Sequence, residues 1–112
     1  MINFEAGDVV LVPFPFTDLI GLKKRPSVVV SSAAYQQRRR DAILMAITSR
    51  VRTPLDFAEA EIVHWQASGL LKPSLFKPLL FSLEQKRILR RMGSLQPHDR
   101  ENLHAILGQI IG

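Results

Sequence analysis

The chain has 112 residues and a formal charge of +5, from 15 Lys and Arg against 10 Asp and Glu, with a sequence pI of about 10.2. This length predicts a single domain, residues 1–112, that folds without a covalent or metal staple. The absence of cysteine excludes disulfides and thiolate metal sites, and no apolar run suits a signal sequence or a membrane span. We therefore expect a cytoplasmic protein, and the high pI makes nucleic acid a reasonable partner.

Two short runs of aliphatic residues, 9–12 and 28–30, predict the first pair of strands. Val suits the pleated, half-buried surface of a sheet, and Pro13 should end the first strand because it has no amide hydrogen to donate. The segment that follows, up to Arg25, is rich in Pro, Gly and charge and predicts a long loop. Long ordered loops often bind or catalyse.

Three consecutive cations, Lys23, Lys24 and Arg25, end this predicted loop just before Pro26. Proline restricts the preceding residue to extended conformations. Arg25 is thus presented from a stiff point, where its guanidinium can hold a phosphate through two parallel hydrogen bonds. The same residues also fit a solvated basic turn that keeps a strand edge from aggregating, and the local sequence is compatible with both interpretations.

The next segment, residues 31–41, predicts either a short helical turn or a loop. Arginines 38–40 are consecutive and cannot share one helix face, which favours a solvated loop tip over a binding site. The run ILMAI at 43–47 then predicts a buried strand that ends at Thr48-Ser49-Arg50. Hydroxyls at a strand end indicate local turn chemistry first, and the rim of a site second.

A weaker strand is predicted over residues 57–63, with Glu59 and Glu61 facing water. Residues 64–69 resemble a single helical turn that Gly69 ends, with Trp65 in the core. Further strands are predicted over 75–83 and 88–92.

Lys77-Pro78 interrupts the strand predicted over 75–83 and should mark an edge or a bulge. The order of about six short strands and a final helix is typical of an antiparallel α+β domain, most simply a small barrel.

The C-terminal helix is predicted to begin at Pro97, a residue suited to the first helical position, with Asp99 and Glu101 at the positive end of the helix dipole. Its apolar side chains should pack on the sheet, each contributing about 1.5–3 kcal/mol before chain entropy is subtracted. They are Leu103, Ile106, Leu107, Ile110 and Ile111. His98 and His104 share no helix face, so no metal site is predicted.

Several segments together resemble the MazF/PemK family of toxin-antitoxin toxins. They are GDVVLVPFPFT, KKRPSVVVS, the strand ending in AITSR, GLLKPS and the terminal helix. The resemblance covers nearly the whole chain and lies in the order and spacing of these segments. It implies a small antiparallel SH3-like barrel with a C-terminal helix, usually a homodimer, that cleaves single-stranded RNA at short sequences without a metal or cofactor. It also implies a cognate antitoxin with an acidic, disordered segment.

The resemblance assigns roles to individual residues. Arg25 matches the catalytic arginine of the family, Thr48 matches the hydroxyl residue that ends the third strand, and Ser49 is its neighbour. In such enzymes the neighbouring 2′-hydroxyl attacks the phosphorus and leaves a 2′,3′-cyclic phosphate and a 5′-hydroxyl. Several members carry an acidic residue just before the arginine, which this chain lacks, so the general base is not identified and Asp18 is only a distant candidate.

RNA binding is expected to use cationic, polar and aromatic side chains around Arg25, with Phe14 or Phe16 available to stack on a base. The expected set is Phe16, Thr17, Asp18, Lys23, Lys24 and Arg50. Two alternatives are a gyrase-poisoning toxin of the same fold and a non-catalytic nucleic-acid-binding barrel. The Arg-Pro and Thr-Ser segments favour the nuclease over the gyrase poison.

Overall fold

The computed structural model describes residues 3–13 and 23–112 of the chain. The elements in these ranges are β1 (Asp8–Pro13), β2 (Lys24–Val29), α1 (Ala33–Arg38), β3 (Asp41–Thr48), β4 (Ala60–Glu61), β5 (Leu75–Glu84), the 3₁₀ turn η1 (Gln85–Arg87), β6 (Arg90–Ser94) and α2 (Pro97–Ile110).

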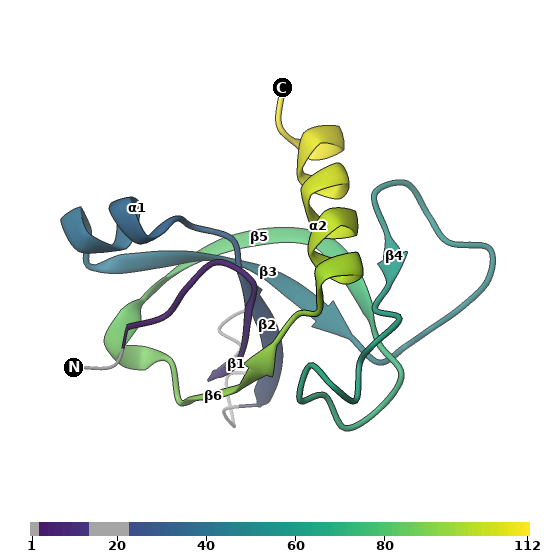
Figure 1. Cartoon of the computed structure of the whole chain (residues 1–112), viewed down its shortest axis with the longest axis horizontal. Coiled ribbons are helices and arrows are strands. Elements are labelled where there is room, and N and C mark those ends of the chain that lie inside the picture. The colour runs from purple at the N-terminus through teal and green to yellow at the C-terminus, as the bar shows by residue number, and fades with distance from the viewer. Residues whose placement is uncertain (1–2, 14–22) are drawn as a thin grey trace.

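All of these strands join one antiparallel sheet in the order β4-β5-β3-β2-β1-β6. The sheet curls into a half-barrel, and α2 packs against it beside β4 and β5 (Figure 1). This architecture confirms the predicted fold class, a small antiparallel α+β barrel with a C-terminal helix. Neither described α-helix is long and apolar enough to cross a membrane.

Both faces of the central strands are buried, which explains why their sequences are nearly continuous runs of aliphatic residues rather than alternating ones. On one face Val9, Val28 and Met45 pack with Phe76 beneath α2. On the other face the neighbouring residues Val10, Val29 and Leu44 pack with Phe81, and Phe4 and Ile88 extend this cluster. Successive strand residues therefore support two different cores.

Helix α2 begins at Pro97, as predicted, and buries Leu103 and Ile106 against the sheet. Ile111 follows the helix and is 59% exposed, so the prediction that it belongs to the packed face is wrong. Asp99 has a second role that the sequence did not reveal. Its fully buried carboxylate accepts backbone hydrogen bonds from Val63 and His64, both at 2.9 Å. These bonds tie the start of α2 to the turn that precedes β5.

Strand β2 begins earlier than predicted. Its pairing with β1 sets Arg25 opposite Val12 and Lys24 opposite Pro13, so both cations belong to the strand and not to the loop. The β1 backbone therefore fixes the backbone of Arg25. The rest of the predicted loop, residues 14–22, lies outside the described residues.

The strand predicted over residues 57–63 is reduced to β4, only two residues long. The prediction that Glu59 faces water is wrong, because its side chain is only 8% exposed and lies 3.7 Å from the guanidinium of Arg52. This ion pair turns Glu59 inward, whereas Glu61 is exposed as predicted.

The interruption of β5 at Lys77-Pro78 is confirmed as a bulge, because the register with β3 shifts between Met45 and Ile47. The strand predicted over 88–92 starts later, at Arg90, since η1 occupies the residues just after β5.

The predicted turn before β5 is confirmed, and Gly69 ends it with a φ of +90°. The turn packs against β6 at very short range. A Cβ atom on Gly69 would lie 2.1 Å from the Met92 carbonyl oxygen, and one on Gly93 would lie 2.3 Å from that of Ser68. Both positions thus require glycine. Trp65, half-buried, packs on the core beneath α2, which agrees with its predicted role.

Candidate active site

The ends of β2 and β3 bring the two main predicted site residues together. The two strands pair antiparallel, and the pair nearest to the start of β2 and the end of β3 is Ser27 with Ala46. The pairing ends there, and extending the same register by two residues would place Arg25 across from Thr48. Opposite residues on antiparallel strands have Cβ atoms about 5 Å apart and point to the same face. Arg25 and Thr48 are therefore placed on one face and at the same end of the two central strands.

Arg25 is available to an anionic ligand. Its side chain is exposed, and it takes part in no ion pair within residues 3–13 and 23–112. Lys23 and Lys24 are also exposed, but strand alternation points Lys24 to the face opposite Arg25. The cationic run thus divides between two faces, with Arg25 on the face of Thr48.

Thr48, half-buried, is held by the turn chemistry predicted for it. Its Oγ1 accepts the backbone N–H of Arg50 at 3.1 Å. A hydroxyl has one donor besides its two acceptor lone pairs, so this bond leaves the Thr48 proton free to donate to a ligand. Ser49 and Arg50 follow on the surface, both exposed. This end of β3 therefore offers both hydroxyl and guanidinium donors.

The chain beyond Arg50 is held by its own charges. Arg52 lies 2.7 Å from Asp56 and 3.7 Å from Glu59, and the backbone N–H of Asp56 donates to Glu59 at 2.8 Å. The hydrogen bond from Arg52 to Asp56 is the main reason that the pKa of Arg52 is raised above its ordinary value. Arg52 is thus neutralised by its neighbours, while Arg50 has no ion-pair partner in the described part of the chain.

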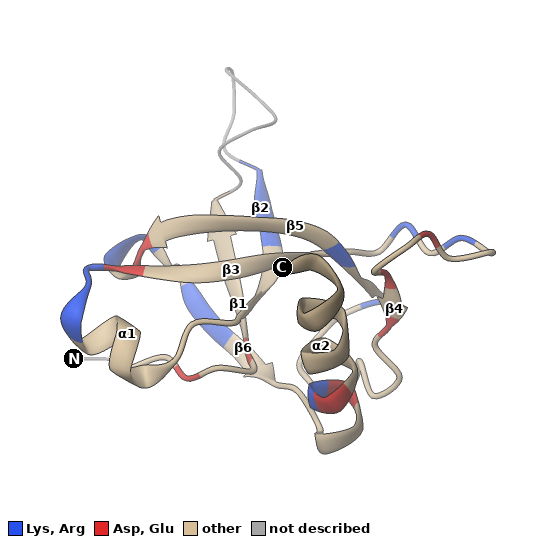
Figure 2. Cartoon of the chain, turned by 90° about the horizontal axis from the view of Figure 1, so that it is seen from above, with Lys and Arg blue, Asp and Glu red and all other residues tan. Residues whose placement is uncertain are grey.

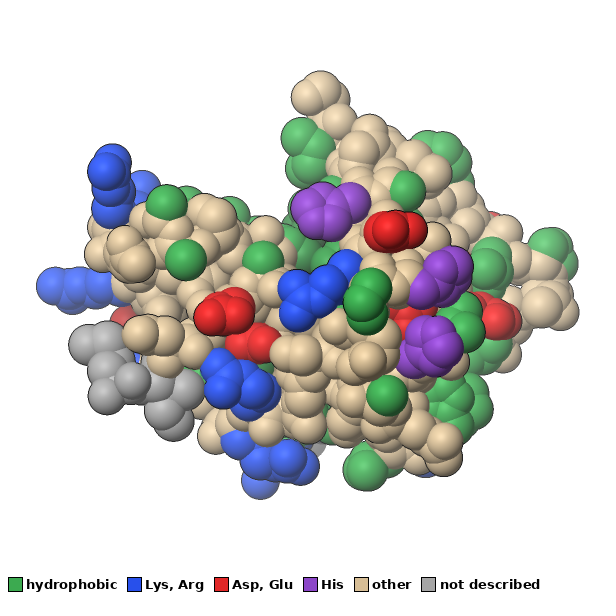
Figure 3. Space-filling view, in the orientation of Figure 1, with side chains coloured by type: hydrophobic (Ala, Val, Ile, Leu, Met, Phe, Trp, Pro, Cys, Tyr) green, Lys and Arg blue, Asp and Glu red, His purple; other side chains and the backbone are tan. Residues whose placement is uncertain are grey.

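The remaining predicted contacts with RNA, Phe14, Phe16, Thr17 and Asp18, lie outside the described residues. The histidines lie elsewhere, beside α2 (Figure 3), where the rings of His64 and His98 meet edge to face at 6.4 Å. Within residues 3–13 and 23–112, no three His, Asp or Glu side chains gather as ligands for a metal ion.

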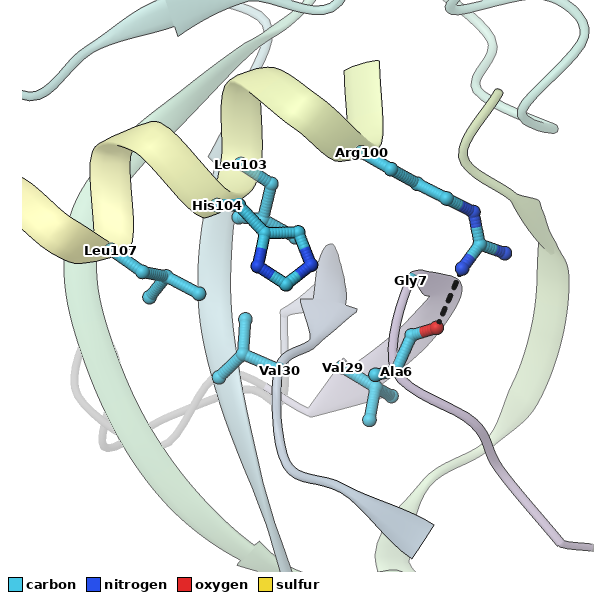
Figure 4. A pocket seen from close by; sticks show the side chains of 8 residues that line it. All are labelled: Ala6, Gly7, Val29, Val30, Arg100, Leu103, His104 and Leu107. Carbon is cyan, nitrogen blue, oxygen red and sulfur yellow. Dashed lines mark hydrogen bonds between the residues drawn. The ribbon is translucent and has the colours of Figure 1, made fainter. Parts of the chain in front are cut away.

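A small cavity of about 50 Å³ lies between α2 and the start of β1 (Figure 4). The guanidinium of Arg100 closes one side and donates to the carbonyl oxygens of Leu95 at 3.0 Å and Ala6 at 3.1 Å. The cavity is small, its other walls are mostly aliphatic, and two of the Arg100 donors are bonded to the backbone, so it is a poorer site for an anion than the end of β2. We therefore place the candidate site at Arg25 and Thr48.

Ser27 is a residue of this region that sequence reasoning missed. It lies between Arg25 and the core on the same face of β2, is fully buried, and its Oγ has no hydrogen-bond partner within the described residues. A buried, unpaired hydroxyl costs free energy. The only sequence signal is a serine directly after Arg25-Pro26, at the start of a valine run.

Replacing Ser27 with alanine is expected to leave the free energy of unfolding unchanged or raise it by about 1 kcal/mol, because the substitution removes an unpaired buried hydroxyl. Ser31→Ala is the matched control. The Ser31 hydroxyl donates to Gln36 at 2.6 Å and accepts from the Ile43 N–H at 3.0 Å, so its loss should cost about 1–2 kcal/mol. Urea denaturation compares the two, and equal losses would show that Ser27 has a partner.

The curled sheet and its exposed donors define a small α+β protein in which one end of the central strands suits an anionic ligand. Residues 5–111 match the family model described as PemK-like, MazF-like toxin of type II toxin-antitoxin system. The chain therefore belongs to this family of toxins, which confirms the resemblance seen in the sequence.

Solved structures share the fold. An endoribonuclease in complex with its cognate antitoxin from a Mycobacterial species is 15% identical with a TM-score of 0.79, covering 98% of this chain and 96% of that chain. Toxin MazF-mt6 of Mycobacterium tuberculosis is 16% identical with a TM-score of 0.74, covering 92% and 94%. A MazE-MazF structure (Form-III) from Deinococcus radiodurans is 23% identical with a TM-score of 0.71, covering 96% and 95%. A comparison with curated proteins finds no match.

Proposed function

We propose that this toxin is an endoribonuclease that cleaves single-stranded RNA at short sequences without a metal ion or cofactor. The observation that carries the proposal is the register of β2 and β3, in which exposed Arg25 and the hydroxyl of Thr48 lie two residues beyond the last pair, Ser27 with Ala46, at the same end of the sheet. Membership of the toxin family supports it, and so does the likeness of the fold to a structure described as an endoribonuclease.

In the proposed reaction the 2′-hydroxyl oxygen forms a bond to the adjacent phosphorus while the bond from phosphorus to the 5′-oxygen breaks. The products are a 2′,3′-cyclic phosphate and a 5′-hydroxyl. Arg25 binds the non-bridging oxygens through two parallel N–H donors and stabilises the charge that develops on them. Because a guanidinium keeps its protons at any ordinary pH, we assign Arg25 an electrostatic role rather than that of a general acid.

Thr48 and Ser49 donate hydrogen bonds to the phosphate and orient the 2′-hydroxyl. The 2′-hydroxyl must lose its proton as the new bond forms, and the departing 5′-oxygen must gain one. Neither a neutral hydroxyl nor a guanidinium is a base of useful strength. We therefore assign the proton transfers to Asp18, to water or to the substrate itself.

RNA binding in this proposal uses Lys23, Lys24 and Arg50, all exposed near the site, together with Phe16, Thr17 and Asp18. We also propose that the toxin forms a homodimer in the cytoplasm and is neutralised by an antitoxin with an acidic, disordered segment. The net charge of +5 supports attraction to such a segment. Two of the similar solved structures are described as complexes, one with a cognate antitoxin and one with MazE.

The proposal is tested by incubating the purified protein with a long single-stranded RNA and with the same RNA as a duplex. Discrete cuts in the single strand alone are expected. Intact RNA would contradict the proposal, and an assay of DNA supercoiling by gyrase would then separate a gyrase poison from a barrel that only binds nucleic acid.

Thr48→Val removes the proposed hydroxyl donor while keeping the shape of the side chain. We expect cleavage to slow about 10²–10³-fold, the usual effect of losing one preorganised donor, whereas Thr48→Ser should retain most activity. The rate is measured on one mapped cut. Because Thr48→Val also loses the bond to Arg50, urea denaturation is the control, with an expected cost of about 1 kcal/mol. A cleavage rate equal to that of the unchanged protein would remove Thr48 from the mechanism.

A further inference from the structure

A second basic surface lies at the far end of the sheet. Helix α1 ends at Arg38 and is followed by Arg39 and Arg40, and η1 carries Lys86 and Arg87. These two segments are far apart in the sequence but lie side by side in the structure, at the end of β5 where α1 meets β3 (Figure 2). We call these five side chains the distal basic patch.

Gln85 holds the two halves of the distal basic patch together. Its backbone N–H donates to the carbonyl oxygen of Arg40 at 2.9 Å. Its side-chain amide donates to the carbonyl oxygens of Gln36 at 2.9 Å and Arg39 at 3.1 Å. These bonds fix the backbones from which the cations project, so the patch is a built feature of the fold rather than a chance meeting of mobile side chains.

Most of the positive charge in the patch is uncompensated. Arg39 lies 4.0 Å from Asp41, at the limit of an ion pair, and Lys86 lies 3.6 Å from Glu84 in an exposed pair, so both interactions are weak. In the described chain, no ion pair includes Arg38, Arg40 or Arg87, and all three are exposed. Three exposed guanidinium groups without an ion pair among the described residues thus lie at one end of the sheet.

The patch is separate from the candidate active site. Arg40 immediately precedes β3, and Thr48 ends it. A strand of this length spans about 25 Å. One small ligand is too short to touch both, but a single-stranded RNA that follows the protein surface from one to the other is not.

We propose that the distal basic patch binds the phosphates of RNA that flanks the cleaved segment. This inference rests on the proposed function, because the substrate placed at Arg25 is itself a polyanion. Guanidinium groups match phosphate geometry, and contacts of cations with phosphates carry no information on base sequence. The patch therefore strengthens binding of long RNA without choosing its sequence.

The binding test uses a single-stranded RNA whose 2′-hydroxyls are methylated, so that it cannot be cleaved. Its affinity is measured against salt concentration for the unchanged protein and for the triple variant Arg38→Gln, Arg40→Gln, Arg87→Gln. The log–log slope should become shallower by about 2, at about 0.7 per phosphate contact on a single strand. The variant Arg38→Lys, Arg40→Lys, Arg87→Lys keeps the charge and should keep the slope, and Lys72→Gln, an exposed cation outside the patch, should leave it unchanged.

The kinetic test compares a minimal oligonucleotide that holds little more than the cleavage sequence with the same sequence inside long flanks. The glutamine variant should raise KM for the long RNA, leave its kcat unchanged, and act normally on the oligonucleotide. If the glutamine variant cleaves RNA with the same salt slope and the same KM as the unchanged protein, the patch does not bind RNA, while the proposed nuclease activity stands. Absence of cleavage together with a patch-dependent slope would overturn the nuclease and leave the patch as an RNA-binding surface.

Discussion

Arg25→Ala is expected to slow RNA cleavage by at least about 10²–10³-fold, because it removes both donors that would hold the phosphate in the transition state. Arg25→Lys keeps the charge but loses the paired geometry, so it should recover only part of the rate. The rate of one mapped cut is measured under single-turnover conditions, where product release does not enter. Cleavage by the alanine variant at the unchanged rate would remove Arg25 from the mechanism.

The fold should not suffer from this substitution. Arg25 is exposed and makes no ion pair with any described residue, so its removal should change the free energy of unfolding by less than about 0.5 kcal/mol. Lys72→Ala is the control, an exposed cation outside both the candidate site and the distal basic patch that should leave the cleavage rate unchanged. Unfolding curves of both variants, measured together with the kinetics, show whether slower cleavage comes from the missing donor or from an unfolded protein.

Gly69→Ala is expected to lower the free energy of unfolding by about 4 kcal/mol, from a strained positive φ and a collision with the backbone of β6. The new Cβ would lie 2.1 Å from the Met92 carbonyl oxygen, and a backbone atom cannot rotate away as a side chain would. Urea denaturation measures the loss. A variant as stable as the unchanged protein would mean that the turn does not pack on β6 in this way.

Gly108→Ala is the matched control for Gly69→Ala. Gly108 lies in α2, and a Cβ built on it would meet nothing within 4 Å apart from its chain neighbours and the backbone of its own helix. Alanine there should raise the free energy of unfolding by about 0.5–1 kcal/mol, since glycine is unfavourable within a helix. Opposite signs at the two glycines would show that local geometry decides the effect rather than the substitution itself.

The fold was largely predictable because its signals are local. Runs of Val and Ile bounded by Pro and Ser predict strands, and Pro97 followed by helical periodicity predicts α2. The wrong predictions concern residues whose exposure depends on other parts of the chain. Glu59 turns inward beside Arg52, and Ile111 is exposed just past the end of α2 at Ile110.

The candidate site was predictable in its residue types but not in its arrangement. The sequence indicates that Arg25 and Thr48 each stand near a strand end. It does not give the register, which pairing along both strands fixes. For the same reason Ser27 appears as an ordinary strand residue until both faces of β2 are seen to be buried, and the two halves of the distal basic patch appear unrelated until Gln85 joins them.

Mapping the ends of RNA cut in the presence of EDTA tests most directly whether this toxin is a metal-independent endoribonuclease. The purified protein and its Arg25→Ala variant are incubated with the same long single-stranded RNA, and the new termini are identified chemically. Discrete cuts that leave 5′-hydroxyl and 2′,3′-cyclic phosphate ends, and that the variant does not make, are the expected result. RNA that stays intact with the unchanged protein, or cuts that vanish in EDTA, would contradict the proposed chemistry.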